Sequence, residues 1–226
     1  MCHIDKDSYI LDVGCGVGIT ACYIAKEYGC KVVGIDISET MVKRSKERAK
    51  RKGVEDKVEF RVADAQDLPF KDNLFDAVVS ESVNAFIEDK QKAVNEYKRV
   101  LKPGGYVGFN EVTWVETPPP ELVEYMSRAL GGAEFLTPGG WKDLLEGARL
   151  TDIVARTYKT TAWRQWANEV KHRWLRSPHT LGKILRSKRC HHSVCNQSKN
   201  HDCQREQSSQ GFLICTHPKS QLKSLL

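Results

Sequence analysis

The sequence predicts an α/β fold in which a mostly parallel, doubly wound sheet is covered by helices on both faces. Three observations support this three-layer α/β/α arrangement. Short apolar runs alternate with helical patterns over the first 170 residues. One run, at 75–80, is continuous, as expected of a strand buried on both faces. The spacing of the runs leaves room for helical crossovers, and such sheets bind ligands at the carboxyl ends of their strands.

The first half of the chain is expected to form two strand-helix units followed by two further strands. The first helical pattern ends at Gly29, and the second is bounded by Ser38, a capping residue, and by Gly53. The expected elements are strands at 9–13, 31–36, 58–62 and 75–80, and helices at 19–28 and between Ser38 and Gly53.

The second half is expected to continue the alternation with less regularity. A helix with one apolar face at 93–101 should end at a Lys-Pro-Gly-Gly run over 102–105. Three prolines at 118–120 should break the chain after the next strand. The expected elements are strands at 106–113 and 152–160, and helices at about 121–130, 138–147 and 162–175.

Length and composition favour a cytoplasmic protein with one main domain. The chain has 226 residues, of which 40% are apolar, enough to bury one substantial core. No apolar stretch approaches the roughly 20 residues of a membrane-spanning helix, and the first residues lack the pattern of a secretory signal. We therefore expect no membrane partner, and reduced cysteines at Cys2, Cys15, Cys22 and Cys30.

Charge divides the chain near residue 170. Residues 1–170 hold 24 Lys and Arg against 27 Asp and Glu, whereas residues 171–226 hold 11 against 2. We expect a domain over 1–170 and a basic, Cys-, His- and Ser-rich tail over 171–226 that is poorly ordered. The tail contains no Cys-x2-Cys pair, so no metal site is expected. The basic stretch at 43–52 is interpreted as a solvated helix face, and a nucleic-acid partner is not favoured.

Three glycines follow the first expected strand at alternate positions. Gly14, Gly16 and Gly18 let the backbone turn sharply and approach a ligand, because no Cβ fills that space. The helix after them offers unpaired N–H groups to an anion. Nicotinamide enzymes use a similar turn, but their third glycine normally comes three residues after the second, whereas here it comes two after. The full string, Asp12-Val13-Gly14-Cys15-Gly16-Val17-Gly18, is more restrictive than the glycines alone.

Five motifs occur in an order that is typical of one enzyme family. In one-letter code they are ILDVGCGVG from residue 10, VGIDIS from 33, DAQDLPF from 64, FDAV from 75 and RVLKPGG from 99. On these motifs, residues 9 to about 160 resemble the class I S-adenosylmethionine-dependent methyltransferases, especially the small-molecule branch that includes ubiquinone and menaquinone biosynthesis enzymes. The resemblance implies a Rossmann-like methyltransferase sheet, S-adenosylmethionine as the cofactor, and a small-molecule methyl acceptor.

The resemblance also implies roles for residues near the strand ends. The glycine turn with Cys15 would hold the methionine portion of the cofactor, and Asp12 would either brace the turn or contact the cofactor. Asp36, 22 residues after Gly14, would accept hydrogen bonds from both ribose hydroxyls. Helix capping by Asp36 and a solvated position for Asp64 stay open as alternatives. The other implied contacts are Ile37 on the adenine face, Asp64 at the adenine amino group, the Ala65 N–H at the ring, and Ser80, Glu81 and Ser82 at the methyl-donor pocket.

Methyl transfer from a sulfonium is an in-line displacement, so much of the catalysis can come from alignment and exclusion of water. If the acceptor needs a general base, Glu81 and Glu111 near two strand ends are the candidates. Glu81 could equally orient substrate, pair with a cation or face water. The region 114–141 lies where the family places its substrate cover, and its apolar content suggests an apolar acceptor, although core packing explains it as well.

Two features depart from the family pattern. Family members usually have some tens of residues before the first strand that form a helical lid, whereas here that strand begins by residue 9, so no lid is expected. A seventh strand is expected antiparallel beside the sixth, and only 211–215 is apolar enough, some fifty residues late. The alternatives are a non-catalytic cofactor-binding or nucleic-acid-associated module of the same fold, and a nicotinamide-dependent oxidoreductase.

Overall fold

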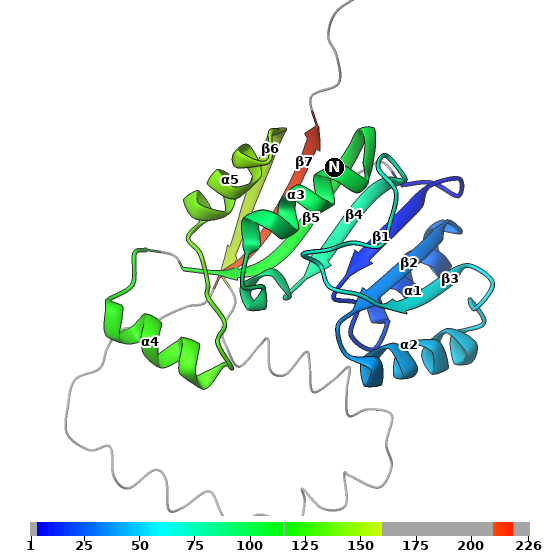
Figure 1. Cartoon of the computed structure of the whole chain (residues 1–226), viewed down its shortest axis with the longest axis horizontal. Coiled ribbons are helices and arrows are strands. Elements are labelled where there is room, and N and C mark those ends of the chain that lie inside the picture. Colours follow the sequence, from blue (N-terminus) through cyan, green and yellow to red (C-terminus); the bar gives the residue numbers. More distant parts are fainter. Residues whose placement is uncertain (1–3, 115, 160–209, 219–226) are drawn as a thin grey trace, which may run out of the picture. The chain divides into compact units, whose positions relative to one another are not determined.

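Seven strands form one sheet in the order β3-β2-β1-β4-β5-β7-β6 (Figure 1). The computed structural model describes residues 4–114, 116–159 and 210–218. The five strands from β3 to β5 are paired in parallel, and β7 is antiparallel to β5. The strands are β1 (Tyr9–Val13), β2 (Lys31–Asp36), β3 (Val58–Val62), β4 (Phe75–Glu81), β5 (Leu101–Thr113), β6 (Leu150–Lys159) and β7 (Gln210–Pro218).

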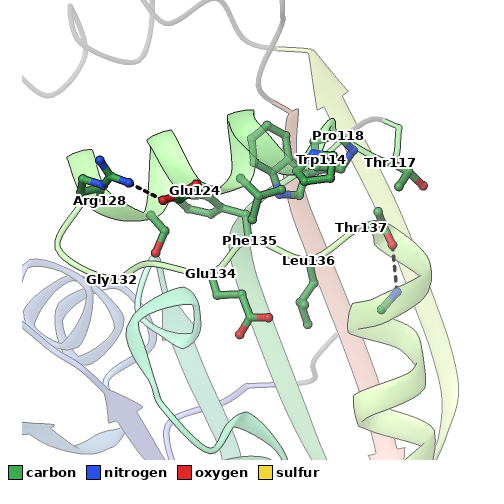
Figure 2. Close-up of a pocket in the computed structure, with 14 residues that line it drawn as sticks. Trp114, Thr117, Pro118, Glu124, Arg128, Gly132, Glu134, Phe135, Leu136 and Thr137 are labelled. Carbon is green, nitrogen blue, oxygen red and sulfur yellow. Dashed lines mark hydrogen bonds and ion pairs between the residues drawn. The ribbon is translucent and has the colours of Figure 1, made fainter.

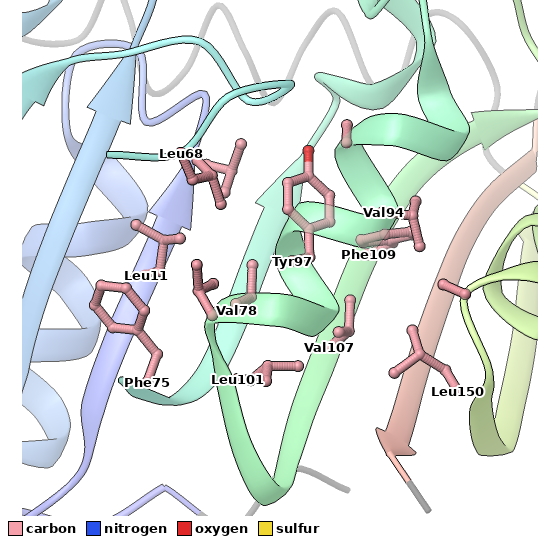
Figure 3. Packing of buried hydrophobic residues seen from close by; sticks show 14 of the residues in the cluster. Leu11, Leu68, Phe75, Val78, Val94, Tyr97, Leu101, Val107, Phe109 and Leu150 are labelled. Carbon is pink, nitrogen blue, oxygen red and sulfur yellow. The ribbon is translucent and has the colours of Figure 1, made fainter. Parts of the chain in front are cut away.

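Helices cover both faces of the sheet, which confirms the predicted doubly wound, Rossmann-like α/β/α class. Two hydrophobic clusters form because alternate residues of a strand point to opposite faces. Leu11 of β1 packs with α3 and α5, whereas its neighbour Ile10 packs with α1 and α2. Figure 3 shows part of the first cluster, in which Tyr97 of α3 lies among residues of β4 and β5. The helices are α1 (Ile19–Tyr28), α2 (Glu39–Lys52), α3 (Lys90–Val100), α4 (Pro120–Ala129) and α5 (Pro138–Gly147), with a 3-10 turn η1 (Asn84–Phe86).

The ends of α1 and α2 confirm the local signals in the sequence. The Ser38 hydroxyl accepts a hydrogen bond from the backbone N–H of Met41, which caps α2. Gly29 and Gly53 end the two helices in the left-handed conformation, with φ of 75° and 64°, which costs glycine little. The basic side chains at the end of α2 lie where the helix dipole favours positive charge.

The boundary before β5 differs from the prediction. We expected this strand to begin at residue 106, but it begins at Leu101, which pairs with Phe75. The register then shifts, and the next pair is Ala77 with Tyr106. The Pro-Gly run that the sequence suggested as a helix stop is therefore accommodated as an irregularity within the strand, with Gly104 at φ 84°.

Strand β7 lies within the stretch 171–226 that the charge pattern set apart. It supplies the expected seventh strand, and it inserts between β5 and β6 in the sheet. Its register with β5 runs from Val107 opposite Thr216 to Thr113 opposite Gln210. The division of the chain near residue 170 stays a prediction. The expected helix at 162–175, and most of the cysteines and histidines for which a metal site was considered, lie outside the described residues.

The register of the parallel strands gathers three chain segments at one edge. Val13 at the end of β1 pairs with Ile35 of β2 on one side and Ser80 of β4 on the other. The glycine turn after β1 therefore lies beside Asp36 and Glu81, the last residues of β2 and β4. None of the helices in the described part of the chain combines the length and apolar character that crossing a membrane requires.

Candidate functional site

The glycine turn after β1 contains one position that faces open space. The turn is closed by a 2.8 Å hydrogen bond from the Gly18 N–H to the Cys15 carbonyl. Gly16 has φ 52°, and a Cβ built there would meet nothing within 4 Å. At Gly18 a Cβ would lie 2.8 Å from atoms of both Phe60 and Ser45. Gly16 therefore leaves room for a ligand, whereas Gly18 allows the start of α1 to approach α2 and β3.

Asp36 connects the end of β2 to this turn. Its carboxylate accepts 2.9 Å hydrogen bonds from the backbone N–H groups of Gly16 and Ser38. The side chain is partly exposed, so further lone pairs remain for a ligand. The next residue, Ile37, is 75% exposed. The two residues together offer a hydrogen-bond acceptor and an apolar surface.

Asp12 lies beneath the turn and is only 2% exposed. Its Oδ2 atom finds no hydrogen-bond partner in the described part of the chain. Burial, together with the nearby negative charges of Glu81 and Asp36, raises the pKa of Asp12 to about 7. No lysine or arginine of the described residues forms a salt bridge with any of these three carboxylates. Burial favours the neutral form of Asp12, and the Arg48 guanidinium donates a 2.7 Å hydrogen bond to the Val17 carbonyl of the turn. Asp36 and Glu81 are therefore the carboxylates near the turn that could receive a cationic part of a ligand.

The carboxylates are not arranged as a metal centre. Among the residues that the structure describes, no group of three or more His, Cys, Asp or Glu side chains could hold a metal ion. Burial also raises the pKa of the Cys15 thiol, so this side chain stays neutral within the turn.

Glu81 is exposed at the end of β4 and has two oriented contacts. Its Oε2 accepts a 2.8 Å hydrogen bond from the Thr20 hydroxyl, and its Oε1 accepts a 3.3 Å hydrogen bond from the Asn110 amide. No motif in the sequence predicted either partner. A polar residue two positions after Gly18, in the first turn of a helix, was the available signal for Thr20. Asn110 was detectable only from its register opposite Glu81.

Ser80 and Glu111 lie inside the molecule. The Ser80 hydroxyl accepts a hydrogen bond from Asn84, and the Glu111 carboxylate accepts hydrogen bonds from the same residue. Ser82 is exposed and has φ 57°, a conformation that side chains rarely adopt. Of the three residues expected at the methyl-donor pocket, Glu81 and Ser82 are exposed, whereas Ser80 points into a buried polar cluster.

The segment with Asp64 and Ala65 follows β3 and is hydrogen-bonded to α3 and to the residue before it. The Gln66 side chain donates to the Asp64 carboxylate and accepts from the N–H of Asp89, just before α3. Further along the segment, Arg99 donates to the carbonyls of Leu68 and Phe70. Asp64 itself is exposed, and Ala65 packs partly against the first hydrophobic cluster.

A groove of about 890 Å³ lies between α4 and the segment that leads to α5 (Figure 2). The rings of Trp114 and Phe135 meet edge to face in its wall, with centroids 6.1 Å apart. Glu124 pairs with Arg128 along the helix. The remaining lining residues are Thr117, Pro118, Pro120, Val123, Ser127, Gly132, Glu134, Leu136, Thr137 and Gly140.

Comparison with known families agrees with this geometry. Residues 11–109 match the family model described as "Methyltransferase domain". These residues contain the glycine turn, Asp36, Asp64 and Glu81. This part of the chain belongs to that family, and the resemblance to class I S-adenosylmethionine-dependent methyltransferases, with S-adenosylmethionine as the family's cofactor, is confirmed.

Two curated relatives illustrate the similarity. The chain is 43% identical over 166 residues to norajmaline N-methyltransferase of Rauvolfia serpentina, which covers 71% of this chain and 56% of that protein. It is 33% identical over 158 residues to the chloroplastic tocopherol O-methyltransferase of Arabidopsis thaliana, with 70% of this chain and 40% of that protein covered. The chain therefore spans about half the length of these relatives.

Solved structures share the fold. The crystal structure of the MccD protein matches with a TM-score of 0.68 and 25% identity, covering 95% of this chain and 92% of that one. Geranyl diphosphate C-methyltransferase from Streptomyces coelicolor matches with a TM-score of 0.69 and 19% identity, covering 96% and 76%. At that identity the second match concerns the fold alone.

The residues present fit S-adenosylmethionine. The cofactor carries a cationic sulfonium and an ammonium group, which suit the carboxylates of Asp36 and Glu81 near the turn. Its ribose diol suits the partly exposed carboxylate of Asp36, and its adenine suits the exposed side chain of Ile37. The space above Gly16 would accept its backbone-like methionine portion, because no Cβ stands there.

Proposed function

We propose that this protein is an S-adenosylmethionine-dependent methyltransferase that transfers a methyl group to a small, mainly apolar acceptor. One observation carries the proposal. An open glycine position, a carboxylate that hydrogen-bonds to it, and an exposed apolar side chain lie together at the carboxyl ends of β1 and β2. Each of the three suits a different part of one cofactor. The membership of residues 11–109 in a methyltransferase family supports the assignment.

Each part of the site then has a distinct task. S-adenosylmethionine supplies an activated methyl group when it is bound. Asp36 holds the ribose hydroxyls, and Ile37 covers one face of the adenine. Asp64 accepts from the adenine amino group, while the Ala65 N–H donates to the ring. The turn of Gly14, Cys15, Gly16 and Gly18, braced by Asp12, receives the methionine portion, and Ser82 with Glu81 borders the reacting methyl group.

Glu81 is the better candidate for a general base. It is exposed at the end of β4, where a ligand can reach it, and Thr20 and Asn110 orient its two oxygens. Glu111 is 2% exposed, and one of its oxygens already accepts three hydrogen bonds. We therefore assign proton removal, where an acceptor requires it, to Glu81 and not to Glu111.

The groove beside α4 supports the class of acceptor. Its wall contains two aromatic rings and several aliphatic side chains, which favour an apolar molecule. Two of the relatives are named for small molecules, norajmaline and tocopherol. The buried free thiols of Cys15, Cys22 and Cys30 further support a cytoplasmic location, where thiols stay reduced, and fractionation of cells that express the full chain would check it.

Calorimetric titration with S-adenosylhomocysteine and with NAD tests the proposal. We expect binding of the first and none of the second, and Asp36→Ala should weaken binding by about 2 kcal/mol, since it removes hydrogen bonds to a charged group. Asp56→Ala, at an exposed position in a turn, serves as the matched control. Preferential binding of NAD, or unchanged affinity in Asp36→Ala, would contradict the proposal.

A transfer assay then tests the acceptor class. Labelled S-adenosylmethionine is incubated with a cell extract, which is separated into organic-soluble, protein and nucleic-acid fractions. We expect the label in the organic-soluble fraction. Label in nucleic acid, or binding of the cofactor with no transfer to any fraction, would instead favour the nucleic-acid-associated or non-catalytic module.

A further inference from the structure

A buried polar cluster lies directly beneath the turn that follows β4. It joins residues of β4, η1, α3 and β5, all almost completely buried. Asn84 is central, because its amide donates to the Ser80 hydroxyl and to the Glu111 carboxylate, while its carbonyl oxygen accepts from the Tyr97 hydroxyl. Buried polar side chains that are hydrogen-bonded to one another in this way restrict local geometry.

Glu111 provides the anchor of this cluster. Its Oε1 atom accepts hydrogen bonds from the backbone N–H of Val83 at 3.0 Å, and from the backbone N–H and side-chain amide of Asn84, both at 2.9 Å. Its Oε2 atom is buried and finds no partner in the described part of the chain. A carboxylate with three donors on one oxygen holds those donors strongly. Glu111 therefore defines where the chain turns after β4.

The turn itself is strained where it leaves the strand. Ser82 has φ 57°, and its N–H donates a 2.8 Å hydrogen bond to the Asn110 carbonyl. Such a conformation costs free energy in a residue other than glycine, and it persists where the surroundings impose it. The hydrogen bonds that the next two residues, Val83 and Asn84, donate to the Glu111 carboxylate supply that constraint.

On one side, the turn after β4 packs against the glycine turn after β1. A Cβ built at Gly14 would lie 2.3 Å from Cγ2 of Val83, so this side chain occupies the space directly beside the glycine. Val83 is also the residue whose N–H is bonded to Glu111. A displacement of the turn after β4 would therefore change the packing of the glycine turn.

On the other side, the turn after β4 is hydrogen-bonded to a residue that lines the groove beside α4. The Ala85 carbonyl accepts a 2.8 Å hydrogen bond from the N–H of Glu134, which lies next to Phe135 in the groove wall (Figure 2). Lys90, only 8% exposed, donates to the Ile87 carbonyl and pairs with the Glu134 carboxylate, both at 2.9 Å. The segment 82–87 thus contacts both the glycine turn and the residues that line the groove beside α4.

We propose that Glu111 is a positioning residue that holds the 82–87 turn. Through this turn it couples the glycine turn, where the methyl donor would bind, to the groove beside α4, where the acceptor would bind. The inference rests on the proposed function, because it assigns the two surfaces to donor and acceptor. In-line transfer needs the two ligands at a set separation. A single buried anchor for both surfaces provides that separation, and it gives Glu111 a role that does not require contact with substrate.

Hydrogen exchange with and without S-adenosylhomocysteine tests this coupling. In the wild-type protein, binding should slow exchange at residues 14–18 and also at 132–136. In Glu111→Met, which lacks the acceptor, affinity should fall about tenfold, as expected for lost charge-assisted hydrogen bonds, and protection of 132–136 should disappear. Glu111→Gln keeps one carbonyl oxygen, so its affinity should stay within about twofold of wild type.

Two further variants separate positioning from general loss of stability. Tyr97→Phe is the matched control, because it removes a buried hydrogen bond of the same cluster and leaves the three bonds to Glu111 intact; its affinity should change by less than about twofold. Val83→Ala removes the contact with Gly14. In the Val83→Ala background, Glu111→Met should have a clearly smaller effect than in the wild type.

The outcomes distinguish this inference from the proposed function. If the wild-type protein fails to bind S-adenosylhomocysteine, the proposed function fails. If it binds, but folded Glu111→Met keeps wild-type affinity and protection at 132–136, or if the effects of Glu111→Met and Val83→Ala simply add, the coupling is overturned. Should Glu111→Met not fold, Val83→Ala decides alone, and unchanged affinity and protection in that variant overturn the coupling.

Discussion

The carboxylate of Asp36 accepts a 2.9 Å hydrogen bond from the backbone N–H of Gly16, which ties the end of β2 to the turn after β1. The contact joins residues 20 positions apart in the sequence. It explains how one acidic side chain can both shape the turn and leave lone pairs for a ligand. The carboxylate is therefore oriented before any ligand arrives, which lowers the cost of binding.

Two glycines of the turn, Gly16 and Gly18, should respond differently to the same substitution. Gly16 and Gly18 have φ of 52° and 73°, so alanine at either costs about 1–2 kcal/mol of backbone strain. At Gly18 the added Cβ also overlaps Phe60 and Ser45, which adds about 1–3 kcal/mol. We expect Gly18→Ala to be the less stable variant in urea unfolding.

Gly16→Ala should instead impair ligand binding. Its Cβ meets no protein atom and projects into the open space above the turn. Titration with S-adenosylhomocysteine should show weaker binding for Gly16→Ala, measured under conditions where the variant is folded. Equal stability of the two variants would show that the packing at Gly18 is not tight. Unchanged affinity of Gly16→Ala would show that the open space above Gly16 is not part of the ligand site.

Asp12 should make stability depend on pH. Its pKa is raised from an ordinary value of 3.8 to about 7, so the folded protein holds this proton more tightly than the unfolded chain. Unfolding then releases a proton between about pH 4 and pH 7, and the free energy of unfolding falls as the pH rises through that window. Between pH 5 and pH 7 the loss should be about 2 kcal/mol.

Urea unfolding of the wild type and Asp12→Asn across that range checks this expectation. The amide has no proton to release, so the dependence should be smaller in the variant. Burial also raises the pKa of Glu111, which acts in the same direction, so a residual slope is expected. A stability that rises between pH 5 and pH 7 in the wild type, and equally in Asp12→Asn, would show that Asp12 is not desolvated as described.

Arg99 should stabilise the segment that carries Asp64. Its guanidinium donates to the carbonyls of Leu68 and Phe70 and to two carboxylates, Glu96 and Asp72. Arg99→Ala should lower the free energy of unfolding by about 1–3 kcal/mol and speed hydrogen exchange over residues 64–72. The control is Arg128→Ala, which removes an exposed ion pair with Glu124 and should change stability by at most about 1 kcal/mol. Similar losses in the two variants would argue against the anchoring role.

Local signals in the sequence predicted most elements of the fold well. Ser38 and Gly53 are the physical ends of α2, and Gly29 ends α1, because capping and left-handed glycines act within a few residues. The start of β5 was wrong by five residues, since its pairing with Phe75 depends on a strand far away in sequence. A Pro-Gly run within an irregular strand leaves no local signature that separates it from a helix stop.

The candidate site was only partly predictable. The motifs placed Asp36 and Glu81 at strand ends, and the structure gathers those ends at one edge. The contacts of Glu81 with Thr20 and Asn110 come from three separate elements, so no periodicity reveals them. The burial of Glu111 is likewise set by the fold, because the turn that donates to it lies more than twenty residues earlier in the chain.

The place of β7 in the sheet has a consequence for how the chain can be shortened. Seven residues of β5, from Val107 to Thr113, have their partners in a strand that begins only at Gln210. A chain ended before that point would keep the whole glycine turn yet present the bare edge of β5 to other molecules. Unpaired strand edges recruit further strands, so such a fragment would tend to self-associate even though its ligand pocket is untouched.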